Sequence, residues 1–104
     1  MEKNYPSVFD QVILKQLKKA SKNKQIQAIL QKMLDKIELL GPACGELIDS
    51  QLHIYEVKNK RPPIRLYFKH NIESNETYIF EFEMKTSEKK QAKTINKLRK
   101  LSKA

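Results

Sequence analysis

The residues best suited to chemistry are cations at alternate positions of segments typical of β-strands. Lys58 and Arg65 lie in two such segments, and Lys85 continues the phase of a third. Three cations on one rigid surface can hold a phosphate group and stabilise charge that develops on it. Arginine offers a planar fork that matches phosphate oxygens, whereas lysine offers a point charge. One hypothesis is therefore a phosphate-handling sheet face.

A simpler interpretation of the same cations is cross-strand ion pairing. Carboxylates in the same predicted strands would neutralise Lys58 and Arg65 if they share their face. These carboxylates belong to Glu56, Glu81 and Glu83. Spacing alone favours this interpretation. Tyr55 and Tyr67 would stack on bases only if they lie on an open surface.

Other chemistry has weaker support. His53 and His70 have no cysteine or carboxylate at metal-ligand spacing, which argues against a zinc site. Cys44 has no obvious base nearby, so we expect a small buried or loop cysteine rather than a nucleophile. Gly41 and Gly45, the only glycines, do not form a phosphate loop, which argues against an ATP- or NAD-dependent enzyme.

The composition adds a strong positive charge. The 104 residues carry 21 Lys and Arg against 12 Asp and Glu, a net charge of +9. Residues 85–104 supply +7 of this net charge. These cations form either the solvated face of a helix or a surface that binds phosphates or a partner. One cysteine excludes a disulfide framework. The length predicts one domain, residues 1–104, and the absence of a long apolar run predicts a cytoplasmic protein.

Apolar residues at helical intervals predict two N-terminal helices. The first spans residues 7–21, with Ser7 and Asp10 at capping-box spacing. The second spans residues 24–40 and ends at Gly41-Pro42, a typical helix stop. The short turn between them predicts an antiparallel helical hairpin.

The hydrophobic period then changes to two, which predicts strands over residues 52–58, 64–69 and 77–84. Short connections make them an antiparallel meander, and residues 2–6 are a candidate fourth strand. We expect the helices to cover the apolar face, in an α+β domain. Ser87 is a candidate cap for a last helix over residues 88–101. The expected helix-facing side chains are Ile64, Leu66, Phe68, Tyr78, Phe80, Phe82 and Met84; the expected exposed ones are Glu56, Lys58, Arg65, Tyr67, Lys69, Glu81 and Glu83.

Three segments resemble toxins of the RelE/ParE superfamily from type II toxin–antitoxin modules, particularly the phage-associated HigB-like branch. They are LLGPACGELIDSQLHIYEVK, PPIRLYF and FEFEMKTSEKKQAKTINKL. The likeness is clearest from residue 40 to residue 98, where a Leu-Gly-Pro loop, a Tyr-x-Val-Lys strand and a Lys-rich stretch keep the family's order and spacing. The resemblance implies an N-terminal helical hairpin on a small antiparallel sheet of three to four strands, plus a C-terminal helix.

The resemblance also implies an activity: cleavage of messenger RNA on the ribosome by an endoribonuclease that needs no metal or cofactor. Lys58, Arg65 and Lys85 fall at or beside the family's basic catalytic positions. The implied partners are messenger RNA, the ribosome and a helix-turn-helix antitoxin. Binding to a membrane is not expected. The residues expected to contact RNA or the ribosome are Lys60, Arg61, Tyr67, Lys69, Lys89, Lys90 and Lys93.

Two departures from the family pattern keep other functions open. Glu56 stands where RelE-like members often have a cation, and residues 86–104 contain no Tyr or His that would serve as an acid–base residue. A ParE-like toxin that inhibits DNA gyrase, a degraded toxin and a non-catalytic nucleic-acid-binding domain therefore remain alternatives.

Overall fold

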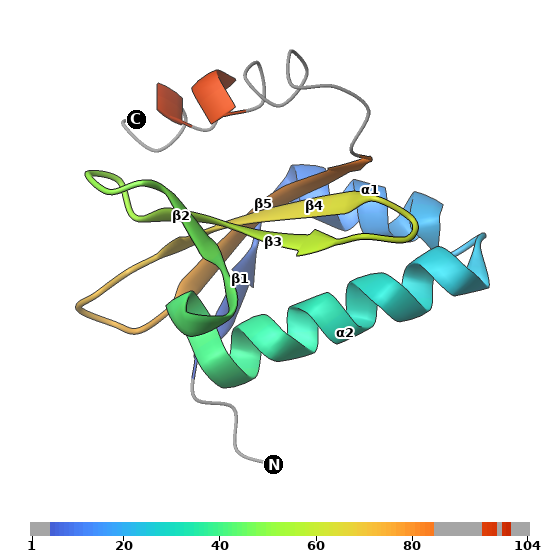
Figure 1. Ribbon diagram of the computed structural model, residues 1–104, viewed down its shortest axis with the longest axis horizontal. Helices are drawn as coiled ribbons and strands as arrows, with labels where there is room; N and C mark the ends of the chain where they lie inside the picture. Colours follow the sequence, from blue (N-terminus) through green and yellow to red (C-terminus); the bar gives the residue numbers. More distant parts are fainter. Residues whose placement is uncertain (1–4, 85–94, 98, 101–104) are drawn as a thin grey trace.

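A five-stranded mixed sheet with two helices on one face forms the frame of the molecule (Figure 1). The structure, a computed structural model, describes residues 5–84, 95–97 and 99–100. In that part of the chain, no helix has the length and apolar character needed to cross a membrane. The elements are β1 (Ser7–Phe9), α1 (Gln11–Ala20), α2 (Lys24–Leu40), the 3-10 helix η1 (Gly41–Cys44), β2 (Glu46–Asp49), β3 (Ile54–Asn59), β4 (Ile64–His70) and β5 (Thr77–Met84).

The first helix begins later than the sequence predicts. Asp10, not Ser7, is the N-cap of α1, and its carboxylate accepts a hydrogen bond from the Val12 N–H at 2.9 Å. Ser7 lies in β1, which pairs in parallel with β5. The prediction of a helix over residues 7–21 is therefore wrong for its first turn, because pairing with β5 holds that segment extended.

The second helix matches its predicted bounds of residues 24–40. The Asn23 side chain accepts hydrogen bonds from the N–H groups of Gln25 and Ile26 and so caps its first turn. Gly41 ends it with a φ of 56°, and a Cβ there would lie 2.6 Å from the Tyr5 ring. Only glycine meets both conditions, so this helix stop is confirmed.

The sheet has the strand order β1-β5-β4-β3-β2. Strands β3 to β5 form the predicted antiparallel meander. Two further strands were not predicted, namely β2, which is antiparallel to β3, and β1, which is parallel to β5. The prediction of three to four strands is therefore too low. Strand β3 starts at Ile54 because the preceding turn is held by Asp49, which accepts the Leu52 N–H, and His53 has a φ of 55°. Strand β4 runs one residue further than predicted, to His70.

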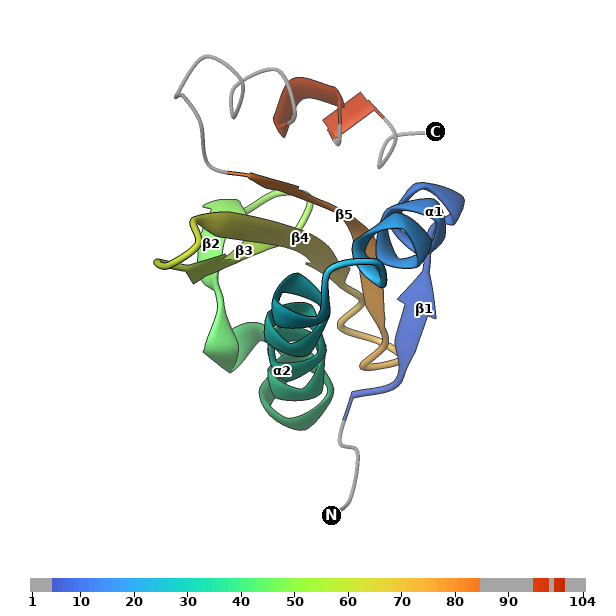
Figure 2. The same cartoon turned by 90° about the vertical axis from the view of Figure 1, so that its right-hand side faces the viewer.

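One face of the sheet packs on α1 and α2 and holds the larger apolar cluster, here called the helix-side cluster. Its buried members are Ile13, Leu30, Met33, Leu34, Ile37, Val57, Ile64, Leu66, Phe68 and Ile79. Figure 2 shows the two helices on one side of the sheet and the helical residues 95–97 and 99–100 on the other. We call this other side the second face.

A bulge in β5 changes which of its side chains meet the helices. Tyr67 pairs with Glu81 and Phe68 with Ile79, so Phe80 is an extra residue in the strand. Ile79 and Phe82 consequently join the helix-side cluster, whereas Phe80 turns to the second face. The predicted uniform alternation along residues 77–84 is therefore wrong, although the bounds of the strand are correct.

The second face carries a smaller apolar cluster, called the second-face cluster. Ile54, Tyr67 and Phe80 form its buried centre, and Ile95 of the C-terminal segment packs against it. Residues 95–97 and 99–100 are helical, in agreement with that part of the predicted helix. The predicted cap Ser87, and the rest of the span 88–101, lie outside the described residues.

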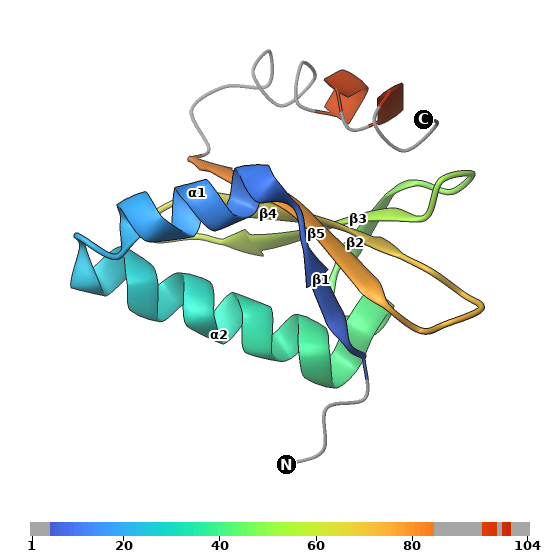
Figure 3. The same ribbon diagram turned by 180° about the vertical axis from the view of Figure 1, so that it is seen from behind.

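Helix α1 lies beside β5 (Figure 3), and the Gln16 side chain ties the two together. Its side-chain amide donates to the Phe82 carbonyl at 2.8 Å, and its side-chain oxygen accepts the Phe82 N–H at 2.9 Å. Strand β1 pairs with β5 only as far as Ile79. The Gln16 amide therefore satisfies the Phe82 backbone groups that a longer β1 would otherwise pair with.

We predict that Gln16→Ala lowers the free energy of unfolding by about 1–3 kcal/mol, because it leaves two half-buried backbone groups without partners. Urea unfolding measures the effect, with Gln11→Ala as the control, since Gln11 is exposed on the same helix. Equal stability of the two variants would refute this role of Gln16.

Candidate functional site

Strand pairing brings the two central cations side by side. Lys58 in β3 is paired with Arg65 in β4, and Arg65 is paired with Glu83 in β5. Two residues along the strands, and therefore on the same face, Glu56 is paired with Tyr67. The predicted grouping of these residues on one face is therefore confirmed.

The predicted exposure of this face is wrong for four of its residues. Arg65 is 5% exposed, Glu56 is 2% exposed, and Tyr67 and Glu83 are buried as well. The reason is that Tyr67 belongs to the second-face cluster, against which Ile95 packs. The sheet thus buries side chains on both faces, and Lys58 is the exposed cation of the pair.

Ion pairs bind the cations to neighbouring carboxylates. The Lys58 Nζ lies 3.0 Å from Glu46 Oε2 and 3.4 Å from Glu56 Oε1. Arg65 Nε lies 3.8 Å from Glu56 Oε2. The ion-pairing hypothesis is thus confirmed for Glu56, while Glu81 pairs with Lys97 of the C-terminal segment instead.

Arg65 retains hydrogen-bonding capacity that its described surroundings do not use. Its Nε and Nη1 atoms are buried, and within the described part of the chain neither has a hydrogen-bond partner. A buried guanidinium donor without an acceptor is costly, and an anionic ligand would satisfy it. Among the described residues, Arg65 is therefore the best candidate to contact a phosphate oxygen.

Two neighbouring groups are held in their protonated forms. The hydrogen bond to Glu46 raises the pKa of Lys58, so this side chain stays cationic at neutral pH. Burial, with the hydrogen bond from its hydroxyl to Glu83 at 2.6 Å, raises the pKa of Tyr67 far above its usual range. Neither group is therefore suited to act as a general base at neutral pH.

The remaining predicted contact residues lie in different environments. Lys60 and Arg61 are exposed in the β3–β4 turn, and Lys69 is half-buried on β4. Tyr67 is fully buried and offers no surface to RNA in this arrangement, so its predicted contact with RNA stays a prediction. Tyr55 stacks on Phe68 at a centroid distance of 5.3 Å and packs on the helix-side cluster. The predicted residues Lys85, Lys89, Lys90 and Lys93 lie outside the described residues.

The described C-terminal residues 95–97 and 99–100 form two ion pairs with the sheet that the sequence did not indicate. Lys97 Nζ lies 2.9 Å from Glu81, and Arg99 Nε donates to Asp49 Oδ2 at 2.8 Å. The Leu52 N–H and Arg99 lower the pKa of Asp49. Asp49 and Glu46 belong to β2, and without that strand nothing in the sequence placed them near the site.

Neither the cysteine nor a metal-ligand cluster forms a second reactive site in the part of the chain that the structure covers. Cys44 is half-buried beside the helix-side cluster, and burial raises the pKa of its thiol, which disfavours the nucleophilic thiolate. Among the described residues, no three His, Cys, Asp or Glu side chains are placed to hold a metal ion.

We predict that Tyr67 makes folding sensitive to alkaline pH. Its pKa is raised in the folded state, so above pH of about 10 the unfolded chain releases a proton that the folded chain keeps. Stability should therefore fall as pH rises beyond that point. Tyr67→Phe should be less stable at about pH 8, by about 1–2 kcal/mol, but should lose stability less steeply at higher pH. Urea unfolding at a series of pH values tests this, and an unchanged pH slope would contradict it.

Comparison with known proteins identifies the fold. No protein-family model and no curated protein sequence matches the chain. Among solved structures, the E. coli RelBE toxin–antitoxin complex matches with a TM-score of 0.65 and 19% identity over 80% of this chain and 99% of that chain. A double mutant of E. coli RelE in the free state matches with a TM-score of 0.67 and 16% identity, over 89% and 96% of the two chains.

A crystal form of the isolated E. coli RelE toxin also matches, with a TM-score of 0.63 and 15% identity over 90% of this chain and 98% of that chain. The similarity thus covers nearly the whole length of the solved chains at low identity. This protein has the α+β fold of the E. coli RelE toxin.

Proposed function

We propose that this protein is the toxin of a type II toxin–antitoxin pair and that it cleaves messenger RNA on the ribosome. The observation that carries the proposal is the Arg65 guanidinium, which is buried with two nitrogen atoms lacking hydrogen-bond partners, beside the cation Lys58. The RelE-like fold also supports it. The cation pair shares the strand phase of Ile54 and Tyr67, which face away from the helices. A phosphate would supply the acceptors that Arg65 lacks.

The chemistry proposed is an internal phosphoryl transfer. The ribose 2′-oxygen attacks the adjacent phosphorus, the bond from phosphorus to the 5′-oxygen of the next nucleotide breaks, and a 2′,3′-cyclic phosphate forms. Negative charge builds on the non-bridging oxygens, where Arg65 donates hydrogen bonds and Lys58 supplies a nearby positive charge. Because Lys58 and Tyr67 hold their protons, water takes the 2′-hydroxyl proton and another proton reaches the 5′-oxygen from water.

The proposed partner in the cell is an antitoxin encoded next to this chain. One of the matching structures is a RelBE toxin–antitoxin complex. In this chain the C-terminal segment is held on the second face by Ile95 and by the pairs Lys97–Glu81 and Arg99–Asp49. A helix-turn-helix antitoxin that displaces this segment, or covers the cations, would control access to Arg65.

A second candidate, a toxin that stops growth without cleaving RNA, is favoured by one observation. Glu46 and Glu56 lie within ion-pairing distance of Lys58, and Glu56 also lies beside Arg65. These carboxylates reduce the positive charge available to a phosphate. A toxin that inhibits a topoisomerase would not need the cations for chemistry.

We predict that Lys58→Ala reduces messenger RNA cleavage by about 10²-fold or more, because it removes charge stabilisation from the transition state. The measurement is primer extension of cellular transcripts after induced expression, together with the growth curve. Lys36→Ala, which removes an exposed cation from α2, is the matched control and should cleave like the parent.

The same experiment separates the two candidate functions. Growth arrest with intact transcripts and a DNA-damage response would favour the topoisomerase toxin. Cleavage that persists at the parent's level in Lys58→Ala would show that the cation pair is not the catalytic site.

A further inference from the structure

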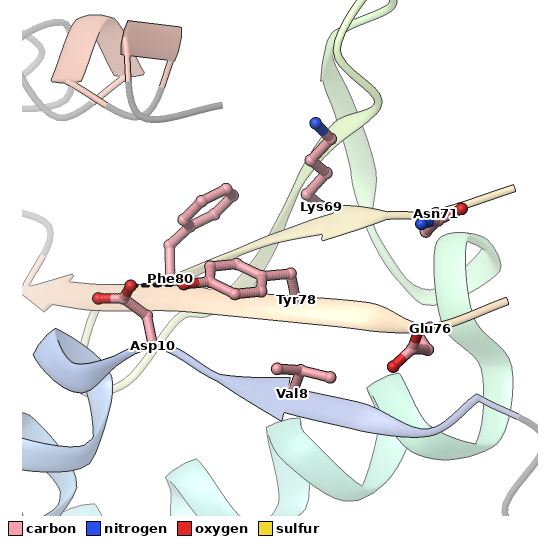
Figure 4. Close-up of a pocket in the computed structure, with 7 residues that line it drawn as sticks. All are labelled: Val8, Asp10, Lys69, Asn71, Glu76, Tyr78 and Phe80. Atoms are coloured by element: carbon pink, nitrogen blue, oxygen red, sulfur yellow. Dashed lines mark hydrogen bonds between the residues drawn. The ribbon is translucent and has the colours of Figure 1, made fainter. Parts of the chain in front are cut away.

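A hollow of about 470 Å³ opens at the far end of the second face, where β1, β4 and β5 meet (Figure 4). Its volume falls within the range of pockets that hold small organic ligands. It lies apart from Lys58 and Arg65, which do not line it. The proposed phosphoryl transfer therefore leaves this hollow without a role.

The inner wall of the hollow is aromatic and held in place. The rings of Tyr78 and Phe80 meet edge to face, with centroids 5.0 Å apart and an interplanar angle of 66°. The Tyr78 hydroxyl donates to Asp10 at 2.6 Å, which fixes the ring, and Val8 adds an exposed apolar side chain. A rigid wall of this kind suits a flat aromatic ligand.

The rim of the hollow offers polar groups that are free to bind. Among the residues the structure describes, none forms an ion pair or a hydrogen bond with the Lys69 ammonium. The Asn71 side-chain oxygen accepts the N–H groups of Glu73 and Ser74, which leaves its two amide hydrogens for a ligand. Glu76 adds a carboxylate acceptor at the rim. Donors and an acceptor around an aromatic wall match the edge and face of a nucleobase.

The hollow lies in line with the cation pair. Lys69 shares the phase of Arg65 on β4 and lies four residues along the strand, about 13 Å away. Once Ile95 is displaced from the second-face cluster, a single strand of RNA that places a phosphate at Arg65 and follows β4 would bring a nearby nucleotide to the hollow. Aromatic side chains that accept unstacked bases are a general feature of single-strand recognition.

We propose that this hollow, the base pocket, binds one unstacked base of the RNA that the protein acts on. The base packs on Tyr78 and Phe80, and Lys69 and Asn71 donate hydrogen bonds to its edge. This inference rests on the proposed function for the identity of the RNA, but base binding itself requires neither cleavage nor a ribosome.

The test is an NMR titration of the purified full-length chain with each of the four nucleoside 5′-monophosphates, and separately with ribose 5-phosphate and with inorganic phosphate. At least one nucleotide should shift the amide signals of Lys69, Asn71 and Tyr78 and bind about tenfold more tightly than ribose 5-phosphate. Equal shifts with ribose 5-phosphate or phosphate would reveal an anion site only and overturn the proposal. An absence of shifts at these residues would overturn it as well.

A pair of variants shows whether the pocket side chains bind the base. Lys69→Ala should weaken nucleotide binding by about fivefold, while Lys15→Ala, which removes an exposed cation of α1, should leave it unchanged. Equal affinity of both variants would contradict the role given to Lys69. If nucleotides bind here but messages stay intact in cells, the proposed function fails and the pocket stands. If messages are cleaved and no nucleotide binds here, the base pocket fails and the proposed function stands.

Discussion

The burial of Arg65 is the constraint on which the rest of this structure depends. A buried guanidinium needs carboxylates and hydrogen-bond acceptors around it, and Glu56 lies beside it from the neighbouring strand. This need for nearby carboxylates accounts for the position of Glu56, which is buried beside Arg65 on the same sheet face. It also leaves two Arg65 nitrogen atoms without a hydrogen-bond partner in the described part of the chain, which is an arrangement that an anionic ligand would complete.

The sheet achieves this burial by packing on both faces. The helices cover one face, and the bulge at Phe80 turns an aromatic ring to the other, where Tyr67 and Ile95 join it. The second face thus combines an apolar cluster, paired charges and an aromatic hollow. The helical residues 95–97 and 99–100 lie on the same face, where Ile95 packs on the second-face cluster and Lys97 pairs with Glu81.

Much of the fold could be predicted from local patterns. The second helix, the Gly41 stop and the strand over residues 77–84 all follow from periodicity and stop signals. The β1 strand could not be predicted, because three residues carry no period and only pairing with β5 holds them extended. The bulge and the short strand β2 also depend on long-range pairing, which one sequence does not reveal.

The shared strand face of Lys58 and Arg65 could be predicted from the sequence, but their environment could not. Strand alternation correctly placed Lys58 and Arg65 on one face, whereas their burial and the contribution of Glu46 depend on neighbours distant in sequence. The measurement that tests the account most directly is RNA cleavage by the purified chain with and without translating ribosomes. The account predicts 2′,3′-cyclic phosphate ends only in messages that are being translated. Messages that stay intact under translation, or cleavage that occurs equally without ribosomes, would contradict it.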